Sequence, residues 1–257
     1  MRLVVAMTGA TGAIIGIRLL EALRELDVET HLVVSRWARA TIAEETPYTV
    51  REVAGLASVS YSPDDQGATI SSGSFHTDGM VVVPCSMKTL AGIRTGYAND
   101  LVARAADVTL KERRRLVLVA RETPLSTIHL ENMLDLSRMG ATVLPPTPAF
   151  YNHPSSVGDV VEHVVGRTLD QFGLTLPTVR RWAGMRQGHQ GEHPRAVTSA
   201  PDLHVAGTLP APAPDLDESG PLAAPAPDLD ETGTLAAPAP DPYSPGPLAA
   251  PGRVKIP

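Results

Sequence analysis

The sequence predicts an α/β protein built on a doubly wound, Rossmann-like parallel sheet with helices on both faces. Three observations support this prediction. Strand-like segments alternate with helix-like segments between Arg2 and Phe172, which requires crossover connections between parallel strands. Residues 80–83 (MVVV) are apolar without alternation, as expected of a strand buried on both faces. Glycines directly follow the first strand, where close packing of a strand against a helix requires them.

The elements can be placed in order. Strands are expected at residues 2–7, 28–34, 80–84, 116–120 and 142–144. Helices are expected at residues 12–26, 35–45, 126–139 and 155–172. Further helices are expected between the strand at 80–84 and residue 108. Ser35 is expected to cap the second helix through its hydroxyl. Pro84 has no backbone N–H, so the ladder pairing of the third strand should end there.

Composition divides the chain into a folded domain, residues 1–185, and a low-complexity tail, residues 186–257. Of the 24 prolines, 15 lie in the tail, which contains three consecutive repeats of equal length (TLPAPAPDLDESG, PLAAPAPDLDETG, TLAAPAPDPYSPG). Leucine is the only large apolar side chain common to the copies, so burial cannot repay the cost of ordering. We expect a disordered tail with polyproline II character. A docking segment for a partner is the alternative.

Charge and cysteine content exclude several classes of protein. Residues 1–185 hold 19 acidic and 18 basic residues, so no basic face indicates nucleic acid binding. The single cysteine excludes a disulfide framework and a cysteine-based zinc site, which fits a reducing interior. The opening MRLVVAMTGATG is too short an apolar run for a signal peptide, and no stretch approaches the roughly 20 apolar residues of a membrane span. A cytoplasmic protein is expected.

The predicted strand ends carry the candidate chemistry, because ligands of such a sheet bind at the carboxyl ends of its strands. Three of them offer amides and hydroxyls at or near helix starts, where an anion is favoured. They are Thr8–Gly12, Ser35–Arg36 and Ser86–Thr89, and the fourth strand end is Arg121–Pro124.

This arrangement predicts a phosphate-binding surface. The glycines do not form G-x-G-x-x-G, and Ser35 stands where a dinucleotide enzyme carries an acid, so FMN is favoured over NAD. Ser35 and Ser86 also fit plain N-caps, which is compatible with binding. Cys85 is interpreted as a packed residue and not a nucleophile, because no base lies nearby in the sequence.

Three sequence runs carry a family resemblance: SSGSFHTDGMVVVPCSMKTLAG, RAADVTLKERRRLVLVARETPLSTIHLENM, and PAFYNHP with a following R-x-L-D-Q-F. Together they resemble the UbiX-type flavin prenyltransferases, a group that includes the B subunits associated with hydroxyarylic acid decarboxylases. The resemblance covers about residues 1–183 and leaves the tail outside. It implies transfer of a dimethylallyl group from dimethylallyl monophosphate to N5 and C6 of reduced FMN. The prenylated FMN then serves a UbiD-type decarboxylase.

The resemblance also implies the site residues and a homo-oligomer, possibly a dodecamer, whose sites are shared between subunits. The sequence has no D-D-x-x-D-like cluster to carry magnesium for a diphosphate, so a metal-independent reaction with a monophosphate donor is expected. Catalytic positions would be Glu122 and Lys111, and the prenyl phosphate would be held by Tyr151 and Arg167. Trp182 is the candidate for sheltering an allylic cation. The positions implied to bind the flavin nucleotide are Gly9, Ala10, Thr11, Ser35, Ser86, Met87, Lys88, Thr89 and Arg121.

Other interpretations stay open at this stage. Lys111, in a run of charges before a strand, also fits a solvated surface, and Arg121 with Glu122 fits a structural ion pair. An FMN-dependent decarboxylase of the related cysteine-decarboxylase type would share fold and cofactor, but its catalytic histidine and asparagine motif are not evident. A non-catalytic flavin carrier subunit is the third possibility.

Overall fold

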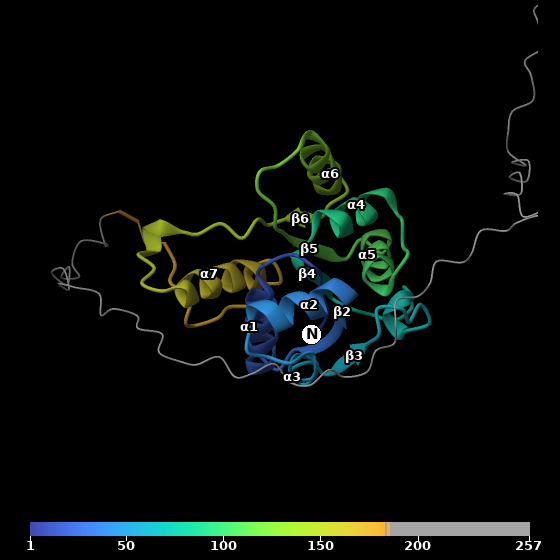
Figure 1. Cartoon of the computed structure of the whole chain (residues 1–257), viewed down its shortest axis with the longest axis horizontal. Helices are drawn as coiled ribbons and strands as arrows, with labels where there is room; N and C mark the ends of the chain where they lie inside the picture. The colour runs from blue at the N-terminus through green and yellow to red at the C-terminus, as the bar shows by residue number, and fades with distance from the viewer. Residues whose placement is uncertain (183, 186–257) are drawn as a thin grey trace, which may run out of the picture. The chain divides into compact units, whose positions relative to one another are not determined.

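The computed structural model describes residues 1–182, 184 and 185, and contains one six-stranded parallel sheet in the order β3-β2-β1-β4-β5-β6 (Figure 1). The predicted disordered tail, residues 186–257, lies outside the described residues. The chain runs outward from β1 to one edge, then crosses to β4 and continues to the other edge. The reversal of strand order between β1 and β4 is where a doubly wound sheet binds ligands. The strands are β1 (Arg2–Met7), β2 (Glu29–Val34), β3 (Val59–Tyr61), β4 (Gly79–Cys85), β5 (Arg115–Ala120) and β6 (Thr142–Val143).

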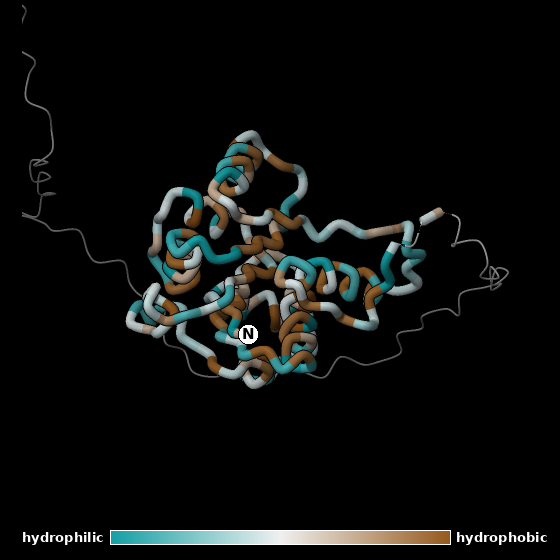
Figure 2. Tube along the Cα trace, turned by 180° about the vertical axis from the view of Figure 1, so that it is seen from behind, coloured by the Kyte–Doolittle hydropathy of each residue, from teal (hydrophilic) through white to brown (hydrophobic). Residues whose placement is uncertain are grey.

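Helices cover both faces of the sheet, as predicted. Alternate strand residues enter one of two apolar clusters. One cluster lies under α1, α2, α3 and α7, and the other lies under α4, α5 and α6. The hydrophobic segments run through the interior between these two layers (Figure 2). The helices are α1 (Ala13–Glu25), α2 (Arg36–Glu45), α3 (Val50–Ala54), α4 (Met87–Thr95), α5 (Leu101–Lys111), α6 (Thr127–Arg138) and α7 (Val157–Asp170), with short 3-10 turns η1 (Thr69–Ser71) and η2 (Phe150–Asn152).

All five predicted strands are confirmed, but β3 and α3 were not predicted. In β3, Val59 and Ser60 are exposed and Tyr61 is only partly buried. An edge strand of three residues with so little burial carries no apolar pattern, so periodicity could not reveal it.

The prediction that pairing ends at Pro84 is wrong by one residue. Strand β4 continues to Cys85, which pairs with Ala120 after an irregularity that follows Val82. The carbonyl oxygen of Pro84 accepts hydrogen bonds from both the backbone N–H and the hydroxyl of Thr8, at 3.2 and 2.7 Å. Proline lacks a donor but keeps its acceptor, and this acceptor keeps β4 attached to the end of β1.

Two absences hold for the described part of the chain. No helix there is long and apolar enough to cross a membrane. No group of three or more His, Cys, Asp or Glu side chains there could hold a metal ion.

Candidate functional site

A cleft of about 720 Å³ opens at the carboxyl edge of the sheet, beside the switch point between β1 and β4. Its wall comes from the segments that follow β1, β2, β3 and β4, so four strand ends converge on it as the topology requires. Five residues predicted to bind the flavin line it: Gly9, Ser35, Ser86, Lys88 and Thr89.

The serines that line the cleft also cap helices. Ser35 accepts a hydrogen bond from the N–H of Ala38 at 3.2 Å and caps α2, as predicted. Ser86 accepts from the N–H of Thr89 at 3.4 Å and donates to its hydroxyl at 3.1 Å. The N–H of Ser86 donates to the buried Thr8 hydroxyl at 2.9 Å. Thr8 therefore ties β1 to the turn after β4 and fixes this side of the cleft.

Two further predicted residues have mainly structural contacts. The N–H of Ala10 donates to the carbonyl oxygen of Thr8 at 2.9 Å, which tightens the turn after β1. Met87 is partly buried and packs against the apolar cluster under α4, α5 and α6. Neither residue lines the cleft, although both are sequence neighbours of residues that do.

Gly9 is needed because Trp37 lies against it. A Cβ at Gly9 would collide with the Cβ of Trp37 and lie 3.3 Å from its backbone carbonyl carbon. The Trp37 side chain is 69% exposed and belongs to the cleft wall. The glycine thus allows the first strand end and the start of α2 to approach closely, and it leaves an aromatic face available to a ligand.

The electrostatics of the cleft suit an anion. Arg36, Arg39 and Lys88 line it, and among the described residues none of them forms an ion pair. The cleft also contains Asp64 and Asp100, but Asp100 accepts a hydrogen bond from the N–H of Ala103 at 2.8 Å as the cap of α5. Three such cations beside helix starts are an arrangement that holds phosphate.

The amides at the start of α1 are already bonded within the chain. The Glu45 carboxylate accepts hydrogen bonds from the N–H groups of Gly12 at 2.8 Å and Ala13 at 3.0 Å. This part of the predicted phosphate-binding surface is therefore satisfied by a side chain from the end of α2. Glu45 was not predicted from the sequence, because no local pattern links the end of α2 to the distant glycine turn after β1.

Glu45 also connects this turn to Arg121. Burial acts to raise the pKa of Glu45, but hydrogen bonds from Thr11, Ala13 and Gly12, together with the charge of Arg121, outweigh it and lower the pKa. The Glu45 carboxylate at the carboxyl edge thus lies within the electrostatic field of the Arg121 guanidinium, without a direct ion pair between these two described residues. The backbone N–H of Arg121 donates to the carbonyl oxygen of Cys85 at 3.0 Å, which places Arg121 next to the β4 turn.

Glu122 lies in the same segment after β5. It is exposed, and its Oε1 accepts a hydrogen bond from the N–H of Thr123 at 3.0 Å. Among the described residues no ion pair joins it to Arg121, so the interpretation of these two as a structural ion pair is wrong. The Glu122 carboxylate is therefore accessible at the carboxyl edge of the sheet.

Cys85 is inert, as interpreted from the sequence. Its side chain is fully buried, and this burial raises the pKa of the thiol to about 12. A thiol that does not ionise near neutral pH is not a nucleophile.

Lys111 lies away from the other candidates. It ends α5, shortly before β5 begins, whereas Arg121 and Glu122 follow the end of β5. The six residues of β5 span about 20 Å at the usual rise of a strand. Lys111 is therefore at the amino edge of the sheet and pairs with Glu112 there.

Tyr151 and Arg167 belong to a third neighbourhood, beside α7. The Tyr151 ring lies edge-on to His163 and to Trp182, with ring centroids 6.1 and 5.4 Å away. Arg167 is one turn after His163 and bonds to Asp170 at 2.7 Å. Tyr151 is 51% exposed and Arg167 is also exposed, so both predicted donor-binding residues lie at the surface of this subunit.

The chain is similar in sequence to known flavoproteins. The model of the family described as Flavoprotein matches residues 1–169. A protein of Streptomyces sp. (strain D7), named a probable UbiX-like flavin prenyltransferase, is 73% identical over 187 residues, which cover 72% of this chain and 94% of that protein. The flavin prenyltransferase LpdB of Lactiplantibacillus plantarum is 53% identical over 184 residues, covering 71% of this chain and 98% of its own length.

Two solved structures share the fold. A structure described as a dodecameric FMN-dependent UbiX-like decarboxylase from Escherichia coli O157:H7 superposes with a TM-score of 0.71 at 69% identity, covering 72% of this chain and all of that one. AnUbiX (PadA1), solved in complex with FMN and dimethylallyl pyrophosphate, also gives a TM-score of 0.71, at 59% identity, covering 71% of this chain and 97% of that one.

Proposed function

Because this chain belongs to the flavoprotein family and, within it, to the UbiX-like flavin prenyltransferases, we propose that it prenylates flavin. The reaction joins the dimethylallyl group of dimethylallyl monophosphate to N5 and C6 of reduced FMN. The product, prenylated FMN, is passed to a UbiD-type decarboxylase. One observation carries the proposal most directly: the cleft at the carboxyl edge presents cations and hydroxyls in a chain that shares 59% identity with a protein solved with FMN and a dimethylallyl donor.

The cleft fits FMN in size and in chemistry. Its volume of about 720 Å³ is within the usual range for cofactor sites. Lys88, Arg36 and the Ser86 turn would hold the phosphate, and the Trp37 face is available to an aromatic ring. When bound, reduced FMN supplies the nucleophilic atoms that accept the prenyl group.

The protein's task is to stabilise charge on the departing phosphate. We assign this role to the cations Lys111, Arg121 and Arg167, with Tyr151 as a hydrogen-bond donor. Glu122, the carboxylate next to Arg121, would accept the proton that leaves when the ring closes. These positively charged side chains would stabilise the negative charge that develops on the phosphate in the transition state. With a monophosphate donor, no metal is required for this purpose.

The placement of Lys111 supports a site shared between copies of this chain. Lys111 is separated from Arg121 by the length of β5, so both can contact one donor only if they come from different subunits. Helix α6 also exposes Ile128 (68%) and Leu134 (51%), the kind of apolar surface that self-association buries. A dodecameric structural relative fits the same assignment.

We further propose that residues 1–185 are the complete transferase domain and that it works in the cytoplasm. The two curated relatives match 72% and 71% of this chain yet are themselves covered over 94% and 98% of their length. A chain ending at residue 185 is therefore expected to keep wild-type transfer activity. Loss of activity on truncation, with folding intact, would give the repeats a role in the reaction.

The direct test is anaerobic incubation of the protein with reduced FMN and dimethylallyl monophosphate, followed by mass analysis of the extracted flavin. A gain of one five-carbon unit supports the proposal, and the diphosphate, tested in parallel, defines the donor. Glu122→Gln should keep FMN binding and slow transfer. An aromatic acid and a peptide with a C-terminal cysteine, incubated with the FMN-loaded protein, test decarboxylation, because one structural relative is described as a decarboxylase. Release of carbon dioxide with unmodified flavin would favour that activity.

A further inference from the structure

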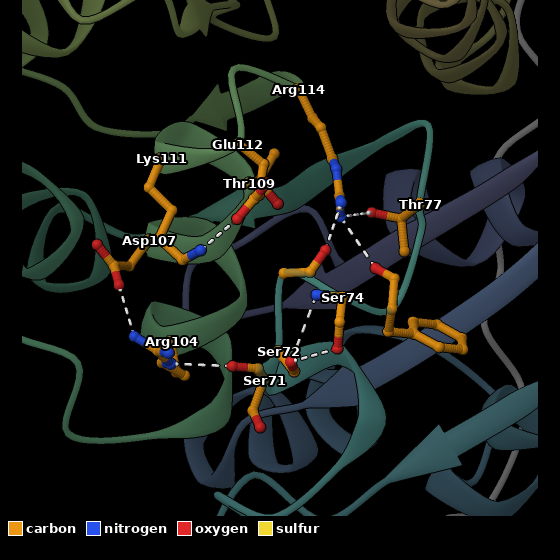
Figure 3. Close-up of polar contacts among 12 residues, drawn as sticks. Ser71, Ser72, Ser74, Thr77, Arg104, Asp107, Thr109, Lys111, Glu112 and Arg114 are labelled. Carbon is orange, nitrogen blue, oxygen red and sulfur yellow. Dashed lines mark hydrogen bonds and ion pairs between the residues drawn. The ribbon is translucent and has the colours of Figure 1, made fainter.

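A loop at the amino edge of the sheet, residues 71–77, accepts three hydrogen bonds from one guanidinium, that of Arg114. Arg114 donates hydrogen bonds to the carbonyl oxygens of Gly73 at 2.7 Å and Phe75 at 3.0 Å, and to the hydroxyl of Thr77 at 3.4 Å. In Figure 3 the Arg114 side chain reaches from the start of β5 into this loop. One side chain thus satisfies three acceptors on a segment that is distant in the sequence.

The other end of the loop is held by α5. Arg104 donates to the carbonyl oxygen of Ser71 at 3.1 Å and is itself oriented by Asp107 at 2.8 Å (Figure 3). Within the loop, the hydroxyls of Ser72 and Ser74 bond to each other at 2.9 Å. Arg104 and Arg114 therefore connect the loop to both ends of residues 104–114, the segment that carries Lys111. A third arginine, Arg2, donates to the carbonyl oxygen of His76 at 2.9 Å and connects the loop to β1.

The loop in turn contacts the Lys111 side chain. A Cβ at Gly73 would collide with the Glu112 carboxylate and come within 2.8 Å of Lys111 Nζ. The Lys111–Glu112 ion pair therefore lies directly on Gly73, the residue whose carbonyl oxygen Arg114 holds. Movement of the loop would displace this pair.

The three consecutive arginines of this segment have different roles. Arg113 is exposed, has a positive φ of 55° and makes no side-chain hydrogen bond among the described residues. Arg115 is also exposed and donates to the carbonyl oxygen of Gln171. Of the three, only Arg114 is partly buried and only Arg114 bonds to the loop. The sequence does not distinguish these residues, but their contacts do.

We propose that Arg114 is a positioning residue for the transfer reaction. Its guanidinium group holds residues 71–77 against the end of α5 and thereby determines the position of the Lys111 side chain. This inference rests on the proposed function, because the position of Lys111 affects transfer only if its ammonium group contacts the donor phosphate. Arg114 itself acts through the loop and need not touch the donor. A lysine cannot replace it, since one ammonium group cannot span three acceptors in a fixed plane.

The first test does not depend on activity. Hydrogen exchange is followed by mass spectrometry in the intact wild type, Arg114→Gln, Arg114→Lys and the control Arg113→Gln, which removes the same charge one residue away. We expect both Arg114 variants to exchange amides in residues 71–77 about tenfold faster or more, with other regions unchanged, and Arg113→Gln to match the wild type. Unchanged exchange in both Arg114 variants would overturn the proposal.

The second test asks whether Arg114 acts through Lys111. We expect Arg114→Gln to lower kcat/KM for dimethylallyl monophosphate about 10- to 100-fold while the Kd for FMN stays unchanged. In the double variant with Lys111→Gln, the loss should equal that of Lys111→Gln alone. The proposal would be overturned if the loss of kcat/KM in the double variant equalled the product of the losses in the two single variants. Full activity of Arg114→Lys would also overturn it. Failure of the wild type to prenylate flavin would instead refute the proposed function, and the exchange result would still report on the loop.

Discussion

A shared site predicts that two inactive variants complement each other. Lys111→Ala removes a cation at the amino edge of one subunit, and Arg121→Ala removes one at the carboxyl edge. If both residues serve one donor from different copies, a mixed oligomer contains some sites with neither change. Such a site needs Arg121 from a Lys111→Ala chain and Lys111 from an Arg121→Ala chain.

The magnitude follows from random assembly. With equal amounts of both chains, each requirement is met in half of the cases, so about a quarter of the sites are intact. The two chains are co-expressed with different tags and purified through both tags, and flavin prenylation is measured per site. We expect about 25% of wild-type activity in the mixed oligomer and almost none in either homogeneous variant.

Two controls define the interpretation. An oligomer of Lys111→Ala with the double variant Lys111→Ala, Arg121→Ala should stay inactive, because no chain supplies the lysine. If the mixed oligomer of the two single variants is equally inactive while remaining assembled and able to bind FMN, Lys111 and Arg121 do not meet at a shared site. The reasoning from the placement of β5 would then be refuted.

Three further predictions concern residues at the carboxyl edge of the sheet. Glu45→Gln should lower the melting temperature at pH 7, and the difference from the wild type should shrink as the pH falls below about 4. The reason is that a carboxyl whose pKa is lowered by folding loses its stabilising effect when it is protonated. A melting-temperature difference that stays constant across pH would contradict this prediction. Cys85, with its pKa raised to about 12, should resist iodoacetamide at pH 8 in the native protein and react once unfolded, as peptide mass analysis would reveal. Gly9→Ala should cost about 1–3 kcal/mol of stability in chemical denaturation and weaken FMN binding, because Trp37 must move; unchanged FMN affinity would show that this contact does not shape the site.

The sequence was sufficient for the regular parts of the fold. Strand β1 has the predicted bounds, and Ser35 caps α2 as expected, because both depend on interactions within a few residues. Strand β3 was not predictable, since its pairing with β2 is a contact between distant segments and its side chains show little burial.

The candidate site divides in the same way. The strand ends that line the cleft, such as Gly9 and Ser86, were predicted because parallel topology brings them to one edge. Glu45 was missed, because its carboxylate reaches the start of α1 only after α2 has packed beside that helix. Sequence periodicity contains no information on such a contact.

By itself the sequence determined the fold class, the edge of the sheet that carries the cleft and the motifs of the family, because each depends on local patterning and on the order of elements. The tertiary structure alone decided that Glu45 satisfies the first helix start, that Arg114 differs from its neighbouring arginines, and that Lys111 lies a strand's length away from Arg121. These are relations between side chains far apart in the chain. They depend on distance and direction in space, which the hydrophobic pattern does not specify.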